Sequence, residues 1–133
     1  MTTETAVYLD SSALVELAVH EAESDALRAH LRRTKRTWIC SALARTEVLH
    51  ALLGCGGEAI AAGCGVLARC EFVRINDRIL KAALILLPPE IRSLDAIHLA
   101  TAQLIRNEIC EIVTYDDRMA GAARLMGLRI SAP

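Results

Sequence analysis

The chain has 133 residues, of which 53% are hydrophobic and only 3% aromatic, and its 15 Lys and Arg against 16 Asp and Glu give a formal net charge of -1. This composition excludes a disordered or fibrous protein and predicts one domain, residues 1–133, with a core of Ala, Leu, Ile and Val. Because the charges balance, any contact with nucleic acid has to come from a local patch.

The cysteines and the N-terminus indicate where the protein works. None of the five cysteines stands in a Cys-x-x-Cys pair or at a Cys/His spacing suited to zinc, which is typical of thiols in a reducing compartment. The start, MTTETAVYLD, lacks the basic and apolar regions of a signal peptide, and the longest apolar run is too short to span a bilayer. We therefore expect a cytoplasmic protein.

Short apolar segments with β-branched or aromatic residues alternate with longer segments of helical periodicity. In chain order these predict a strand at 6–9, helices at 13–19 and 21–33, a strand at 37–40, helices at 42–53 and 58–67, a strand at 71–75, helices at 77–87 and 94–106, a strand at 112–115, a helix at 118–126 and a strand at 128–130. Such alternation predicts an α/β fold with three α/β/α layers and a central, mainly parallel sheet of about five strands.

Aspartates follow two of the predicted strands. Asp10 comes directly after the first strand, and Asp116 and Asp117 follow the strand that ends at Tyr115. Ligands of open α/β sheets bind outside the carboxyl ends of the strands, so these distant residues can converge there. An aspartate after a strand is also a common helix N-cap, and both interpretations stay open for each residue.

Two further acids lie on predicted helices next to apolar neighbours. Glu47 shares a helix row with Leu43 and Ala51, and Asp95 lies near the start of its helix in a row with Leu99. Both therefore border a buried face. On the same helix as Asp95, His98 is expected to order the helix or to donate a hydrogen bond rather than to act as a base.

Carboxylates gathered in a partly buried place need a cation. Lysines are scarce, since Lys35 and Lys81 are the only two, and the arginines near these acids in the sequence are Arg45, Arg92 and Arg118. A divalent cation would compensate the charge. Oxygen ligands of this kind favour Mg²⁺ or Mn²⁺ over zinc, and such an ion suits phosphate chemistry.

Four segments in this order and spacing resemble the PIN-domain nucleases, and specifically the VapC toxins of bacterial type II toxin-antitoxin systems: VYLDSSALVEL, ARTEV, RSLDAIHLATAQL and IVTYDDRMAGAARLMGLRI. The resemblance implies a PIN fold over essentially the whole chain. It places the family's catalytic and metal-binding acids at Asp10, Glu47, Asp95 and Asp116. It also implies hydroxyls near the metal, at Ser11 or Ser12 and at Thr114, and leaves Asp117 as a second candidate at the last acidic position.

The activity that the resemblance implies is that of a toxic, Mg²⁺- or Mn²⁺-dependent endoribonuclease. In this hypothesis Asp10 and Asp95 bind the main ion, Glu47 and Asp116 complete its shell, and an activated water attacks the RNA phosphorus in line. The implied partners are a VapB-like antitoxin protein, RNA, and a second copy of the toxin in a homodimer. The alternative is a PIN-fold binding module without turnover.

A basic run, RAHLRRTKR, spans residues 28–36. It is suited to contact RNA phosphates or an acidic antitoxin tail. It is equally typical of a solvated helix end whose basic residues complement the helix dipole.

Overall fold

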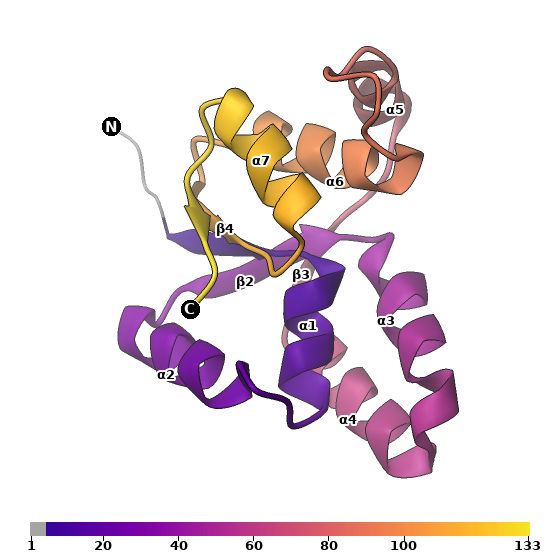
Figure 1. Cartoon of the computed structure of the whole chain (residues 1–133), viewed down its shortest axis with the longest axis vertical. Helices are drawn as coiled ribbons and strands as arrows, with labels where there is room; N and C mark the ends of the chain where they lie inside the picture. Colours follow the sequence, from indigo (N-terminus) through magenta and orange to yellow (C-terminus); the bar gives the residue numbers. More distant parts are fainter. Residues whose placement is uncertain (1–4) are drawn as a thin grey trace.

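A computed structural model describes residues 5–133 of the chain. Five strands form one sheet in the order β3-β2-β1-β4-β5, and every neighbouring pair is parallel (Figure 1). The strands are β1 (Ala6–Leu9), β2 (Thr37–Ser41), β3 (Glu71–Val73), β4 (Ile109–Val113) and β5 (Ile130–Ser131). The predicted parallel sheet is confirmed, with the first strand of the chain at its centre.

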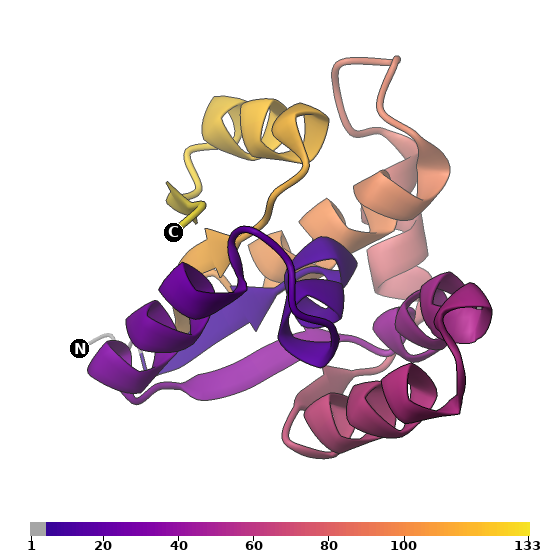
Figure 2. The ribbon, with the colours of Figure 1, turned by 60° about the horizontal axis from the view of Figure 1, so that its bottom comes forward.

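Helices cover both faces of the sheet, as the predicted α/β/α layering requires (Figure 2). They are α1 (Ser11–Ala18), α2 (Ser24–Thr34), α3 (Ala44–Leu52), α4 (Gly57–Ala68), α5 (Asp77–Leu84), α6 (Ser93–Leu104) and α7 (Asp117–Leu125), with a 3-10 turn η1 (Leu53–Cys55) after α3. Helices α1 to α4 pack on one face, α6 and α7 pack on the other, and α5 packs on α6. Within residues 5–133, no helix combines the length and the apolar character that crossing a membrane requires.

The alternation of side chains along β1 divides the core in two. Val7 and Leu9 face the layer of α1 to α4, whereas Ala6 and Tyr8 face α6 and α7, and all four residues are buried. Because β1 is covered on both faces, its sequence is a continuous run of apolar residues rather than an alternating pattern. The single hydroxyl of this strand, on Tyr8, therefore lies deep inside the protein.

The fourth strand differs from the prediction in both its bounds. It begins at Ile109 and ends at Val113, rather than running from 112 to 115. The N–H of Thr114 still donates to the carbonyl of Ser131, but the next N–H, of Tyr115, donates to the Ser12 hydroxyl instead of to the sheet. The chain therefore leaves the sheet before Tyr115, and this brings the segment before α7 against the start of α1.

Candidate active site

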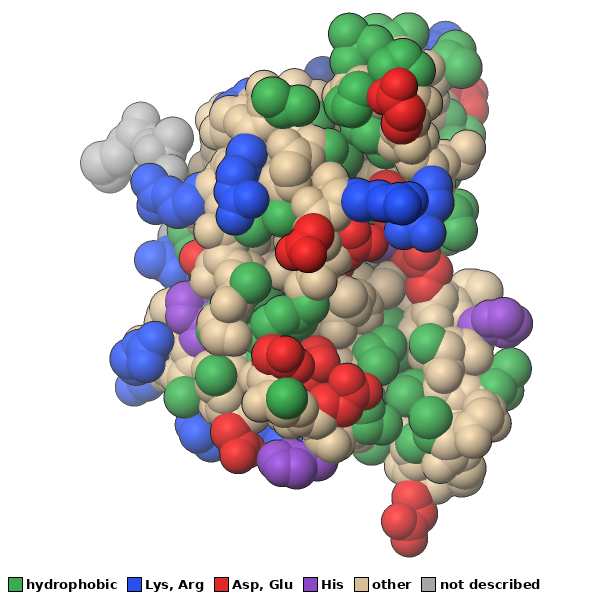
Figure 3. Space-filling model, viewed as in Figure 1, with side chains coloured by type: hydrophobic (Ala, Val, Ile, Leu, Met, Phe, Trp, Pro, Cys, Tyr) green, Lys and Arg blue, Asp and Glu red, His purple; other side chains and the backbone are tan. Residues whose placement is uncertain are grey.

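Four carboxylates from separate elements lie near the carboxyl ends of β1 and β4. Asp10 directly follows β1, Glu47 lies in α3, Asp95 lies in the first turn of α6, and Asp116 lies between β4 and α7. Figure 3 shows acidic side chains beside basic ones where α6 and α7 approach α1 and α3. This edge, where β2 and β4 flank β1 on opposite sides, is where an open α/β sheet binds its ligand.

Asp10 is the most buried of the four acids, with 3% of its surface exposed. Its carboxylate accepts hydrogen bonds from the Ser12 hydroxyl at 2.6 Å, from the Thr114 hydroxyl and from the N–H of Ala13 at 3.1 Å. Burial raises the pKa of Asp10, and these three hydrogen bonds offset the rise only in part. Asp10 is thus both the N-cap of α1 and a desolvated carboxylate that a nearby cation would stabilise.

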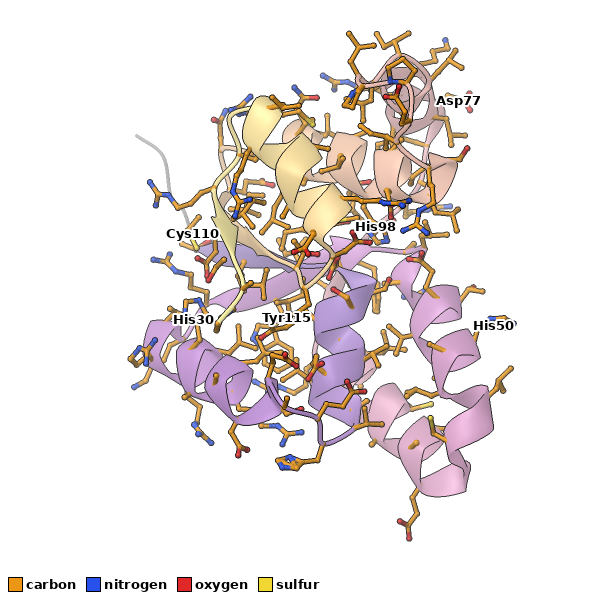
Figure 4. All side chains as sticks on the ribbon, viewed as in Figure 1. His30, His50, Asp77, His98, Cys110 and Tyr115 are labelled. Carbon is orange, nitrogen blue, oxygen red and sulfur yellow. The ribbon has the colours of Figure 1, made fainter. Side chains whose placement is uncertain are left out.

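Glu47 is held by a series of hydrogen bonds that extends through His98 to the buried Tyr8 hydroxyl. The Ser11 hydroxyl donates to its carboxylate at 2.6 Å, and His98 Nε2 lies 2.6 Å from the same Oε1 atom. His98 is 2% exposed (Figure 4), and its Nδ1 lies 2.7 Å from the hydroxyl of Tyr8. Burial opposes ionisation of Glu47, but the hydrogen bonds from His98 and Ser11 outweigh it and lower the pKa of Glu47.

The direction of the hydrogen bond between His98 and Glu47 follows from the chemistry of Glu47. Because the pKa of Glu47 is lowered, its ionised carboxylate can only accept, and Nε2 of His98 donates to it. Burial raises the pKa of Tyr8 well above its ordinary value, so its hydroxyl keeps its proton as the hydrogen-bond partner of Nδ1. His98 is therefore a positioning residue for Glu47, in line with the hydrogen-bonding role expected from the sequence.

Arg92 joins the two remaining acids. Its Nε lies 3.2 Å from Asp95 and its second guanidinium nitrogen lies 3.3 Å from Asp116. Of the three arginines that lie near these acids in the sequence, Arg92 thus pairs with two of them. Arg45 instead stacks on Phe72, with its guanidinium carbon 4.1 Å from the ring centre.

The two aspartates before α7 face different surroundings. Asp116 is the N-cap of the helix and accepts from the N–H groups of Arg118 and Met119 at 2.9 and 3.2 Å. Its own N–H donates to the Thr114 hydroxyl, which in turn donates to Asp10. Asp117, one residue later, is exposed on the first turn of α7. The structure thus brings Asp116, and not Asp117, into the hydrogen-bonded cluster.

The donor set of this site fits a hard divalent cation. Its ligands would all be carboxylate or hydroxyl oxygens, the set that Mg²⁺ and Mn²⁺ prefer, and the buried Asp10 carboxylate has no basic side chain among its hydrogen-bond partners. Within the described residues, no three His, Cys, Asp or Glu side chains are yet close enough together to hold an ion. Arg92 holds Asp95 and Asp116 together, whereas His98 holds Glu47 alone, so an ion has to compete with Arg92 for Asp95 and Asp116.

Sequence reasoning missed two members of this network. Tyr8 belongs to a predicted apolar strand, and its lone hydroxyl in that strand is the signal that it has a buried polar partner. Arg92 was noted as a neighbour of Asp95, but the sequence carried no sign that it also reaches Asp116, 24 residues away.

Comparisons with known proteins agree with this fold. The sequence matches the family model described as PIN domain over residues 7–125. It is 52% identical over 128 residues to Ribonuclease VapC46 of Mycobacterium tuberculosis, covering 96% of this chain and 98% of the relative. Among solved structures, the fold is similar to VapC20 of M. tuberculosis, described as a sarcin-ricin loop cleaving toxin, with a TM-score of 0.75, 17% identity and coverage of 96% and 99%. A toxin-antitoxin complex from Klebsiella pneumoniae matches with a TM-score of 0.73, 20% identity and coverage of 96% and 97%. The chain belongs to the PIN domain family and, within it, to the VapC ribonucleases.

Proposed function

We propose that this protein is the toxin of a type II toxin-antitoxin system and an endoribonuclease that hydrolyses RNA phosphodiester bonds with Mg²⁺ or Mn²⁺. The observation that carries the proposal is the convergence of Asp10, Glu47, Asp95 and Asp116 from four places in the chain to one edge of the sheet. Each carboxylate is oriented by its own partners, as a catalytic constellation requires. The 52% identity to a protein named as a ribonuclease supports the same activity.

The chain's own residues supply orientation and proton transfer. Asp10 and Asp95 are the proposed principal ligands, with Glu47 and Asp116 completing the shell. A bound divalent ion would neutralise the substrate phosphate and lower the pKa of water. Glu47 is suited to orient the attacking water and to accept its proton, since His98 and Ser11 keep this carboxylate ionised and fixed in direction. Ser12 and Thr114 hold the Asp10 carboxylate from two sides.

Cleavage of total RNA by the purified chain, with Mn²⁺ or with EDTA, tests this function. We expect cleavage with the ion and none with EDTA, and loss of cleavage in Asp10→Ala and Asp95→Ala. Asp77→Ala is the matched control, because Asp77 also lies in the first turn of a helix but sits on α5, away from the cluster (Figure 4). Full activity in Asp10→Ala and Asp95→Ala would show that the assignment is wrong.

A comparison of two variants tests which of Asp116 and Asp117 binds the ion. We propose that Asp116 is the acid that serves the ion, because it alone of the two is tied to Arg92 and Thr114. Asp116→Asn should then lose most cleavage activity and Asp117→Asn should retain it. Equal losses in both variants would mean that both acids approach the ion.

A binding module without turnover is the alternative function, and one observation favours it. Arg92 already pairs with Asp95 and Asp116, so about half of the negative charge of these two acids is balanced without an ion. A calorimetric titration of Mn²⁺, run beside the cleavage assay, separates the two functions. Binding of Mn²⁺ with no cleavage of any RNA would support the module.

The proposed protein partner is a VapB-like antitoxin. A solved neighbour of the same fold is a toxin-antitoxin complex, and this chain offers a groove of about 400 Å³ between α1, α2 and α4. Leu17, Leu31 and Trp38 line it, and the basic run contributes Arg28 and Arg32 at its border. An acidic segment with apolar side chains matches this combination of charge and surface.

We also propose that the toxin forms a homodimer through the end of α5 and the loop after it. Leu84, Ile85 and Leu87 are 82%, 76% and 70% exposed, and Figure 3 shows hydrophobic side chains gathered over this part of the molecule. Soluble monomers rarely expose several adjacent large apolar side chains. A second copy is the occupant that we propose, since a two-fold interface brings the same apolar patch of both copies together.

The remaining proposals concern the number of domains and the cellular compartment. One sheet contains strands from Ala6 to Ser131, which supports the proposal that residues 1–133 act as a single domain. We propose that it acts in the cytoplasm, where the RNA is.

A further inference from the structure

A second hollow lies directly beside the acidic site, between the N-terminal half of α6 and the length of α7. This α6–α7 groove has a volume of about 650 Å³. Arg92 and Asp95, which belong to the acidic cluster, also form part of its wall. The groove is therefore continuous with the place where we propose that a phosphodiester bond is cut.

The floor of the α6–α7 groove is apolar and fixed by the core. Leu99, Met119 and Ala122 line it and are 1%, 3% and 5% exposed, and all three belong to the core between the sheet and these two helices. A flat aromatic ring can lie against such a floor, and the methionine sulfur favours contact with aromatic faces. The volume is in the range of pockets that hold small organic ligands.

The rim of the groove next to the acidic site carries two arginines, although Asp95 and Glu90 also line the groove. Arg92 and Arg118 both line the groove and are exposed. Arginine pairs with phosphate oxygens through two N–H groups and also stacks on aromatic rings. An apolar slot with arginines at one end is complementary to a ligand that has an aromatic ring joined to a phosphate.

We infer that the α6–α7 groove binds one nucleobase of the RNA substrate, next to the phosphodiester bond that is cleaved. The base stacks on the floor formed by Leu99, Met119 and Ala122, while Arg92 and Arg118 contact the adjoining phosphates. This inference rests on the proposed ribonuclease function. It makes the groove a determinant of which nucleotide the enzyme accepts beside the cut, because recognition of single-stranded RNA depends on bases stacked in such slots.

The direct test is a methyl NMR titration of the metal-free protein with the four nucleoside 5′-monophosphates at millimolar concentration. We expect at least one nucleotide to shift the methyl signals of Met119, Leu99 and Ala122, and ribose 5-phosphate, which lacks a base, to leave them in place. If no nucleotide shifts these signals, or if ribose 5-phosphate shifts them equally, the inference is wrong.

A variant that fills the groove provides the second test. Gly121 lines the groove on the exposed side of α7, and a Cβ added there meets no atom within 4 Å, so Gly121→Phe places a ring in the groove without disturbing the core. We expect the nucleotide shifts to disappear and KM for RNA to rise about 10-fold or more, as expected for loss of one stacked base, with kcat changed much less. Gly57→Phe, at an exposed helical glycine of α4 that also has open space around it, should leave both unchanged.

The outcomes separate this inference from the proposed function. If the wild type cleaves RNA but Gly121→Phe keeps the wild-type KM, only the groove assignment fails. If the wild type cleaves no RNA, the function fails, whereas the NMR titration still decides whether the groove binds a base. A change in molar mass of Gly121→Phe by light scattering, with no nucleotide shifts in the wild type, would identify the groove as an interface between copies and overturn the inference.

Discussion

Arg92 competes with a divalent ion for the same two carboxylates, so Arg92→Gln should bind Mn²⁺ more tightly than the wild type. The two ion pairs, at 3.2 and 3.3 Å, are made by a side chain that is 62% exposed. Exposed pairs contribute about 0.2 to 1 kcal/mol each, so releasing both costs about 0.4 to 2 kcal/mol. Since 1.4 kcal/mol is a factor of ten, removal of Arg92 should lower the Kd for Mn²⁺ by about 2- to 30-fold.

Electron paramagnetic resonance of free Mn²⁺, at pH 7 and fixed ionic strength, measures this affinity. Arg118→Gln is the control for a general loss of positive charge, because Arg118 also lies at this end of the molecule but its side chain is in none of the ion pairs found among the described residues. If Arg92→Gln binds Mn²⁺ no more tightly than Arg118→Gln does, Arg92 does not occupy the place of the ion and the reasoning is refuted.

Three further predictions concern stability and assembly. Tyr8→Phe leaves the buried Nδ1 of His98 without its hydrogen-bond partner and should lower the free energy of unfolding by about 1 to 3 kcal/mol, measured by urea denaturation; unchanged stability would mean that Tyr8 does not support His98. Because burial raises the pKa of Asp10 above its ordinary value of 3.8, the metal-free wild type should lose stability relative to Asp10→Asn as pH rises from about 3.8 through the raised value. Calorimetry in EDTA from pH 3.5 to 7 measures this, and a difference between the two proteins that is independent of pH would contradict it. Leu84→Lys should convert the proposed dimer to a monomer in light scattering, whereas Leu53→Lys, at a leucine that is 63% exposed outside the patch, should not; a dimer that persists in Leu84→Lys would exclude this interface.

The sequence predicted the layers, and the position of the acids at the carboxyl edge of the sheet, because both depend on local patterns. Alternating apolar strands and amphipathic helices define the α/β/α arrangement, and an aspartate after a parallel strand marks the edge where ligands bind. The N-cap interpretation and the site interpretation proved compatible, since Asp10 and Asp116 each cap a helix while facing the cluster. The end of β4 was misplaced because it is decided by a contact between Tyr115 and Ser12, residues that are 103 positions apart.

The contacts within the site could not be read from the sequence for the same reason. Tyr8 and His98 are 90 residues apart, and His98 and Glu47 are 51 apart, so only the packing of α6 and α3 around β1 brings them together. Arg92 was counted as a neighbour of a single acid, whereas the approach of α7 to α6 gives it two. Local sequence patterns therefore indicate which acids lie at the site, whereas their hydrogen-bond and ion-pair partners depend on tertiary packing.

The central claim is that the four carboxylates form one binding site for a divalent ion, and a calorimetric titration of Mn²⁺ into the wild type, Asp95→Asn and Asp77→Asn tests it most directly. We predict saturable binding in the wild type and in Asp77→Asn, and affinity weaker by about tenfold or more in Asp95→Asn, which lacks one proposed ligand charge. Equal affinity in all three proteins would contradict the claim, because the ion would then bind somewhere other than at these acids.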